Sequence, residues 1–110
     1  MPETPARGDL IYLDFNPQAG HEQAGRRPGI VLSPKEFNEV TGFLSVCLIT
    51  HTVRGWGYEV PLPDGLVFDG VILTDQLKNL DWKARNVEIK GQVSEEVVQD
   101  CLDKVATFLQ

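Results

Sequence analysis

The stretch GDLIYLDF, residues 8–15, decides the fold because two sets of side chains alternate along it. The two sets are Ile11, Leu13 and Phe15 on one side and Leu10, Tyr12 and Asp14 on the other. A period of two is typical of a β-strand, whose successive side chains point to opposite faces of a sheet. Asn16-Pro17 and Gly20 then end the pattern. We therefore expect a strand here.

Further strands follow the first, separated by turn-forming residues. We predict them at residues 29–32, 43–50, 57–62, 71–74 and 86–90. The second of these is apolar without alternation, which indicates burial on both faces. Pro63-Asp64-Gly65 is typical of a turn between two strands.

Two helices complete the predicted set of elements. Ser33-Pro34-Lys35-Glu36 has the spacing of a capping box with proline at the first helical position, so we expect a short helix over residues 34–39. Ser94 is a good cap for a C-terminal helix. Its apolar face repeats every four residues through Val97, Cys101, Val105 and Leu109, with Val98, Leu102 and Phe108 beside them. The predicted fold class is mainly β with helices (α+β), a curved antiparallel sheet closed by a C-terminal helix.

Composition places the chain among ordinary globular domains. With 110 residues, 42% hydrophobic and 24% charged, it predicts a single domain spanning residues 1–110. No apolar run approaches the roughly 18 residues of a membrane span, and no signal-peptide pattern is present, so we expect a cytoplasmic protein without a membrane partner. Cys47 and Cys101 fit buried apolar positions better than a disulfide. Because the net charge is −6, any nucleic-acid role must use a local positive pocket.

Several kinds of chemistry lack their residue patterns. The two histidines, His21 and His51, have no paired metal-ligand spacing, which argues against a metal site. No GxSxG elbow, GxGxxG turn or GxxxxGK[ST] loop occurs, so we expect neither a serine hydrolase nor a nucleotide cofactor. The sequence thus predicts no cofactor and no metal.

Polar residues gather in three places at strand ends, where function usually concentrates. These clusters are Gly20 to Arg27, Thr50 to Trp56, and Thr74 to Gln76. A structural interpretation also exists for each: Arg27 paired with Glu22, Thr50 and His51 ending a strand, and Asp75 capping a turn. The residue types alone leave both interpretations open.

The chain resembles the MazF/PemK family of toxin ribonucleases from bacterial toxin–antitoxin systems. The resemblance is carried by GDLIYLDFNP, GHEQAGRRP, the IVLSP join, TDQLKNLDWKAR and the helical C-terminus, in this order. It implies a CcdB/PemK-like fold, an SH3-like barrel with helices, acting as a homodimer. It also implies metal-independent cleavage of single-stranded RNA (mRNA) and neutralisation by a cognate MazE-like antitoxin with an acidic tail.

The resemblance also assigns roles to residues. Arg27, in the Arg-Pro pair, and Thr50, at the end of the third strand, match the family's catalytic positions in MazF-like members. PemK-like members carry an arginine two residues before the Asp-Gln pair, but this chain has Leu73 there. The GHEQ histidine is present as His21. The catalytic residues are therefore closest to those of MazF.

Metal-free RNA cleavage uses the 2′-OH as nucleophile and yields a 2′,3′-cyclic phosphate and a 5′-OH. The Arg27 guanidinium and the Thr50 hydroxyl suit phosphate stabilisation. An arginine is a poor base, so His21 or Glu22 is the better proton carrier, and the sequence leaves the choice between them open. The expected RNA-binding residues surround these and are Gln23, Arg26, His51, Arg54, Trp56, Asp75 and Gln76. Trp56 and Tyr58 either stack bases or pack structurally, and Trp82 is expected to pack.

Two alternatives remain. A CcdB-like toxin would bind DNA gyrase through an aromatic-glycine-aliphatic tail, whereas this chain ends Thr-Phe-Leu-Gln in an amphipathic pattern. A non-catalytic nucleic-acid-binding module on the same fold would bind RNA without cutting it.

Overall fold

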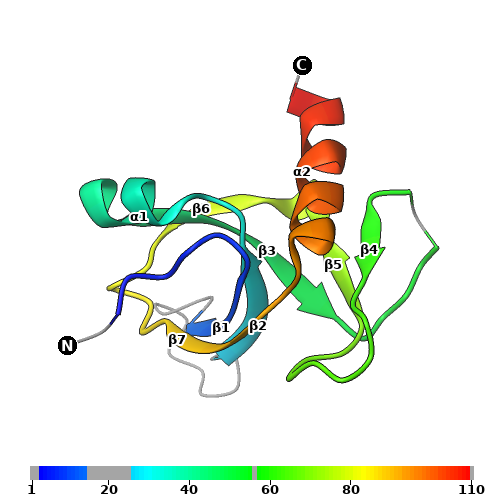
Figure 1. Ribbon diagram of the computed structural model, residues 1–110, viewed down its shortest axis with the longest axis horizontal. Coiled ribbons are helices and arrows are strands. Elements are labelled where there is room, and N and C mark those ends of the chain that lie inside the picture. Colours follow the sequence, from blue (N-terminus) through cyan, green and yellow to red (C-terminus); the bar gives the residue numbers. More distant parts are fainter. Residues whose placement is uncertain (1–2, 15–25, 56, 110) are drawn as a thin grey trace.

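The computed structural model describes residues 3–14, 26–55 and 57–109, and Figure 1 shows them as a curved sheet carrying two helices. The elements in chain order are β1 (Asp9–Asp14), β2 (Arg26–Val31), α1 (Lys35–Thr41), β3 (Phe43–Thr50), β4 (Glu59–Pro61), β5 (Val71–Leu73), the 3-10 turn η3 (Thr74–Gln76), β6 (Lys78–Asp81), β7 (Glu88–Gln92) and α2 (Glu95–Leu109).

The sheet is antiparallel, and its strands follow the order β4-β5-β3-β2-β1-β7, with β6 pairing separately on β3. The long strand β3 changes partners along its length: it pairs with β6 from Phe43, with β2 in its middle and with β5 at Thr50. In the described part of the chain the path ends at β4 and β7 without joining them. The predicted curved antiparallel sheet with a C-terminal helix is confirmed, but hydrogen bonds among the described residues do not close it into a barrel.

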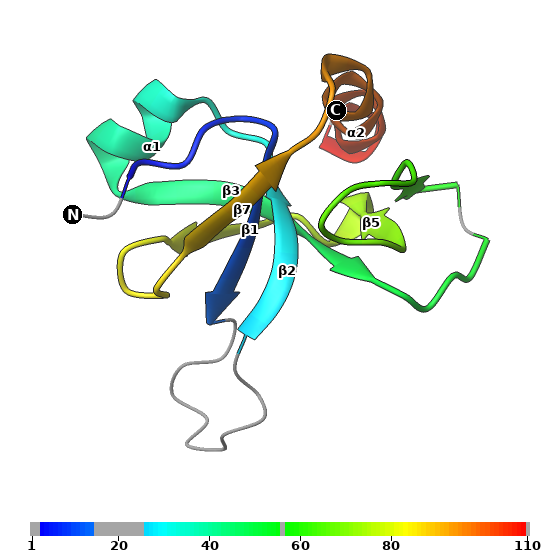
Figure 2. The same ribbon diagram turned by 60° about the horizontal axis from the view of Figure 1, so that its bottom comes forward.

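The alternation in β1 places apolar side chains in two separate cores. Leu10 belongs to the core that includes the buried face of α2, whereas Ile11 and Leu13 belong to the core that includes Trp82. All three side chains are fully buried. Both faces of this strand are therefore packed, which ties β1 to the centre of the fold. Figure 2 shows β1 between β2 and β7.

Helix α2 packs on η3 and β4 through one face, as its four-residue period predicts. Val97, Cys101 and Val105 are buried, and Val98 joins them. Leu109, which we expected on this face, is 67% exposed because the helix extends past the sheet at its C-terminal end. The Ser94 hydroxyl accepts the Val97 N–H at 3.5 Å, at the predicted cap position.

The two cysteines are free and buried in the core beneath α2, as the sequence predicts. Burial is the main reason that the pKa of Cys47 is raised to about 12. Burial likewise raises the pKa of Cys101 to about 12. Both thiols therefore remain protonated in the fold at neutral pH.

Helix α1 differs from its predicted capping. Pro34 lies at the cap position and makes no side-chain cap bond, so the predicted capping box does not form. The Ser33 hydroxyl instead donates to the Asn38 side chain and accepts the Ser45 N–H. Asn38, itself fully buried, accepts the Trp82 indole N–H through its carbonyl at 2.9 Å. The serine thus joins α1 to β3, and Trp82 packs structurally, as expected.

Other predicted boundaries moved by a few residues. β2 begins at Arg26 rather than at residue 29, and β4 covers only residues 59–61 of the predicted 57–62. β7 is shifted by two residues toward the C-terminus, from the predicted 86–90 to 88–92. The strand β6 was not predicted, because KNLD offers a single apolar residue and no apolar alternation. Among the described residues, neither helix has the length and apolar character that a bilayer crossing requires.

Candidate functional site

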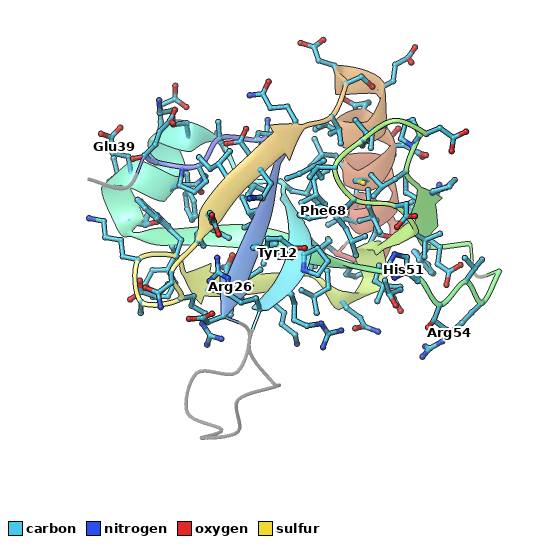
Figure 3. All side chains as sticks on the ribbon, turned by 90° about the horizontal axis from the view of Figure 1, so that it is seen from below. Tyr12, Arg26, Glu39, His51, Arg54 and Phe68 are labelled. Carbon is cyan, nitrogen blue, oxygen red and sulfur yellow. The ribbon has the colours of Figure 1, made fainter. Side chains whose placement is uncertain are left out.

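A hollow of about 390 Å³ lies where β2 and β3 end beside the loop that precedes β5. Its wall is formed by Tyr12, Arg26, Arg27, Pro28, Ile49, Thr50, His51, Val67, Phe68 and Asp69. Figure 3 shows His51 at the end of β3, with Tyr12 and Phe68 between it and Arg26. The volume is within the range of small-ligand pockets. The first two sequence clusters therefore meet at one place.

Strand register explains why Arg27 and Thr50 meet. Gly29 of β2 is paired with Leu48 of β3 in an antiparallel ladder. Arg27 and Thr50 each lie two residues beyond this last pair, so strand alternation puts both side chains on the face of Gly29 and Leu48, and both residues line the hollow. A Cβ at Gly29 would lie only 2.7 Å from the Val46 side chain, which shows how closely β2 and β3 approach here.

Arg27 carries an exposed guanidinium that no acidic group compensates within the described ranges. It has no hydrogen-bond partner there either. A planar fork of N–H donors in this condition is well suited to binding phosphate oxygens.

Arg26 has the opposite environment. Its guanidinium donates to the Asp14 carboxylate at 3.0 Å, to the Asn86 carbonyl at 2.8 Å and to the Glu88 carboxylate at 3.0 Å. It also lies over the Tyr12 ring, 6.0 Å from the centroid. Hydrogen bonds from Asn86 and Arg26 lower the pKa of Asp14, so that carboxylate stays charged. Arg26 thus joins the ends of β1, β2 and β7, and its charge is already neutralised.

Thr50 presents a hydroxyl at the half-exposed end of β3. Its oxygen accepts the backbone N–H of Thr52 at 3.2 Å. Because the lone pair receives that bond, the O–H remains as a donor. A hydroxyl donor in the same hollow as Arg27 suits the binding of an anionic phosphate.

His51 and Asp69 form a histidine–carboxylate pair at the edge of the hollow. Its Nε2 lies 2.5 Å from the Asp69 carboxylate, and both side chains are largely exposed. Gly70, next to Asp69, has a φ of +112°, and a Cβ there would lie 2.2 Å from the Thr50 carbonyl oxygen. Only glycine allows this approach, which brings Asp69 to His51.

The adjoining loop is ordered by Glu59. Its carboxylate accepts the backbone N–H groups of Arg54 and Gly55. Figure 3 shows Arg54 farther out than His51, and Arg54 does not contribute to the wall of the hollow. Its predicted RNA contact would have to lie along this outer loop.

The structure does not bring the third cluster to the hollow. Asp75 lines a separate hollow of about 490 Å³ with Gly57, Tyr58 and Phe108. Tyr58 packs its ring edge to face with Phe108, with centroids 5.9 Å apart. Gln76, exposed on η3, contributes to neither hollow.

Several predicted residues lie outside the described residues, namely His21, Glu22, Gln23 and Trp56. Sequence reasoning missed other parts of the wall, namely Tyr12, Pro28, Val67, Phe68 and Asp69. Tyr12 and Phe68 contact each other edge to face at 5.0 Å between centroids. The signal available for Asp69 was its position before a glycine at the start of a predicted strand.

Comparisons with known proteins agree on one family. Residues 6–109 match the family of PemK-like, MazF-like toxins of type II toxin–antitoxin systems. The chain is 45% identical over 95 residues to the endoribonuclease toxin MazF of Escherichia coli K12, covering 86% of this chain and 85% of that protein.

Solved structures give the same result. A crystal structure of MazF from Deinococcus radiodurans superimposes with a TM-score of 0.88 at 41% identity, covering 98% of each chain. A MazE–MazF crystal structure from the same organism gives 0.87 at 34% identity, covering 98% of this chain and 97% of that one.

Proposed function

The chain belongs to the PemK-like, MazF-like toxins of type II toxin–antitoxin systems, and on this premise we propose that it cleaves single-stranded RNA at the hollow between β2 and β3. It is an endoribonuclease toxin of the MazF kind, whose partners are RNA and a MazE-like antitoxin. The observation that supports this location is that Arg27, whose guanidinium has no acidic partner within residues 3–14, 26–55 and 57–109, lines the same hollow as Thr50.

In the proposed reaction the 2′-oxygen of the nucleotide attacks the adjacent phosphorus. The bond from phosphorus to the 5′-oxygen breaks, leaving a 2′,3′-cyclic phosphate and a 5′-OH. Arg27 donates hydrogen bonds to the non-bridging oxygens as negative charge gathers on them, and Thr50 adds another donor. Donors that are already positioned stabilise such charge most. His21 or Glu22 accepts the 2′-OH proton.

RNA contacts extend from the hollow along its surroundings. Tyr12 and Phe68 offer aromatic surface in the wall of this hollow, and unstacked bases are commonly held on such rings. His51 lies at the rim, and Arg54 and Trp56 belong to the adjoining loop. Gln23, Asp75 and Gln76 would be reached by a longer stretch of RNA. The neutralised Arg26 guanidinium positions β2.

An antitoxin would inhibit this site by competing for the same charge. An acidic tail can place a carboxylate on Arg27 where the phosphate would bind, since guanidinium binds both groups through paired hydrogen bonds. We further propose a homodimer acting in the cytoplasm. Large apolar side chains left exposed, including Phe37, Val40 and Phe43, support an association between copies.

A metal-free cleavage assay tests the proposal. The purified chain is incubated with EDTA and a long RNA of low structure, and the cut positions are mapped by primer extension. We expect cleavage at a short recurring sequence, with 5′ ends that a kinase labels directly. Binding without product would favour the non-catalytic module. Poisoning of DNA gyrase without RNA cleavage would favour the CcdB-like alternative.

The quaternary state needs a separate measurement. Light scattering coupled to gel filtration should give twice the 12.3 kDa mass of the chain. A monomeric mass at micromolar concentration would contradict the homodimer.

A further inference from the structure

The pair formed by His51 and Asp69 has a geometry that binding alone does not require. The Asp69 Oδ1 atom lies 2.5 Å from His51 Nε2, and this hydrogen bond holds one edge of the imidazole ring in place. Among residues 3–14, 26–55 and 57–109, the second ring nitrogen, Nδ1, has no hydrogen-bond partner. A carboxylate that orients an imidazole and balances its positive charge is a recurring arrangement in acid–base catalysis.

The backbone places this pair in the same hollow as the two residues proposed to bind the phosphate. His51 follows Thr50 directly, and both residues, with Arg27 and Asp69, contribute to the wall of one hollow. The paired residues Thr50 and Val71 hold β3 against β5, and Gly70 packs on the Thr50 carbonyl. The carboxylate and the imidazole are thereby supported by the strands that position Thr50.

We propose that His51 is a further catalytic residue, the acid that protonates the leaving 5′-oxygen, and that Asp69 is its positioning residue. This inference rests on the proposed RNA cleavage. When the phosphorus–oxygen bond breaks, the electron pair stays on the 5′-oxygen, and the imidazolium of His51 gives it a proton through Nδ1. The ring becomes neutral and keeps its Nε2–H bond to Asp69. The 2′-OH proton goes to a separate base.

The chemistry favours histidine over the other groups in the hollow. Arg27 is a poor proton donor near neutral pH, because a guanidinium loses its proton only above about pH 12. Thr50 is a weaker acid than the ordinary histidine side chain, whose charge changes between about pH 5 and 8. A phenol is ordinarily a weaker acid than an imidazolium, and the Tyr12 ring packs against Phe68 with centroids 5.0 Å apart. His51 is therefore the described group best suited to deliver a proton.

A substrate with an easier leaving group tests the assignment. One RNA carries the recognised sequence, and a matched RNA replaces the leaving 5′-oxygen at the cut position by sulfur. A thiolate leaves without protonation, so loss of the acid should matter only for the oxygen substrate. For His51→Ala we expect single-turnover cleavage of the oxygen RNA to fall about 100- to 10,000-fold. Cleavage of the sulfur RNA should stay near the wild-type rate.

Three further variants separate the possible causes. Asp69→Asn should show a smaller loss on the oxygen RNA and none on the sulfur RNA. Arg27→Ala should be slow on both, because phosphate stabilisation is needed with either leaving group. Val53→Ala changes an exposed residue of the same loop outside the hollow and should match wild type on both substrates.

The outcomes distinguish this inference from the proposed function. If wild type cuts neither RNA, the proposed cleavage itself is wrong. If wild type cuts both and His51→Ala cuts the oxygen RNA at the wild-type rate, cleavage stands and the role of His51 is wrong. Equal slowing of His51→Ala on both substrates would likewise overturn the proton-donor role. The wild-type rate of that variant on sulfur RNA also shows that it is folded.

Discussion

Arg26 and Arg27 are adjacent on β2, yet only Arg26 is held in ion pairs by the described part of the fold. Arg26 binds Asp14 and Glu88, each at 3.0 Å, whereas Arg27 faces the other side of the strand without an acidic partner there. Successive side chains of a strand point to opposite faces, so the two neighbouring arginines have different roles. Arg26 holds strand ends together, and Arg27 offers positive charge on a protein of net charge −6.

The first prediction compares these two arginines. Arg27→Ala should lower the rate of RNA cleavage by about 100- to 1000-fold, as expected for loss of one preorganised donor. Arg27→Lys keeps the charge but loses the planar fork, so it should recover only part of the rate. Single-turnover rates on one defined RNA give the comparison.

Arg26→Ala provides the matched control. Because its ion pairs are partly exposed, we expect a loss of about 1 kcal/mol or less in the free energy of unfolding. Its effect on cleavage should be much smaller than that of Arg27→Ala. A larger effect of Arg26→Ala on the rate would reverse the two roles.

The second prediction concerns the Thr50 hydroxyl. Thr50→Val keeps the shape of the side chain but removes its O–H and the acceptor for the Thr52 N–H. We expect a fall of about 100-fold in the single-turnover rate with little change in RNA affinity. Thr50→Ser retains the hydroxyl and should stay within about tenfold of wild type. Equal rates for the valine and serine variants would show that the hydroxyl takes no part.

Much of this arrangement follows from local pattern. The alternation around Ile11 and the apolar run ending at Thr50 predict β1 and β3, and the four-residue spacing from Val97 predicts α2. These segments bury apolar faces, and burial imposes a period that a sequence records. The strand β6 was missed because only Leu80 among its residues is half-buried, so the segment carries no such period.

The site was less visible because it depends on strand pairing. The sequence identifies Arg27 and Thr50 as candidates, but their meeting depends on the register of Gly29 with Leu48. Asp69 was missed because its contact with His51 crosses 18 residues and depends on a glycine that packs on a neighbouring strand. Asp75 follows a strand but lines a different hollow, so its contact with RNA stays a prediction.

The third prediction uses the two buried thiols. An ordinary thiol has a pKa of 9.0, whereas burial raises that of Cys47 to about 12. Burial raises the pKa of Cys101 to about 12 in the same way. The unfolded chain therefore loses these protons at lower pH than the folded chain, and stability falls as pH rises from about 9 to about 12. Below pH 9 the contribution is fully present.

Urea unfolding at pH 8 and pH 10.5 measures this effect. Wild type should lose more stability between the two pH values than a Cys47→Ala, Cys101→Ala double variant, although the double variant starts less stable because it leaves cavities. A thiol reagent should also react slowly with native protein at pH 8 and quickly in urea. Identical pH dependence for the two proteins would contradict the assignment to the thiols.

The fourth prediction separates two glycines that share an unusual backbone conformation. Gly65 has a φ of +90° with nothing within 4 Å of an added Cβ, whereas at Gly70 the φ is +112° and the Cβ would lie 2.2 Å from the Thr50 carbonyl oxygen. Gly65→Ala should therefore cost only the backbone strain, about 1 kcal/mol. Gly70→Ala adds a clash with backbone that cannot rotate away, so we expect about 3 kcal/mol or more. Thermal unfolding of the two variants gives the difference, and the same preparations can be assayed on RNA.

Because the Gly70 contact also positions Thr50 and the His51–Asp69 pair, Gly70→Ala should lower cleavage even well below its melting temperature, whereas Gly65→Ala should not. Equal melting temperatures for the two variants would mean that the β3–β5 approach is not as close as the structure shows.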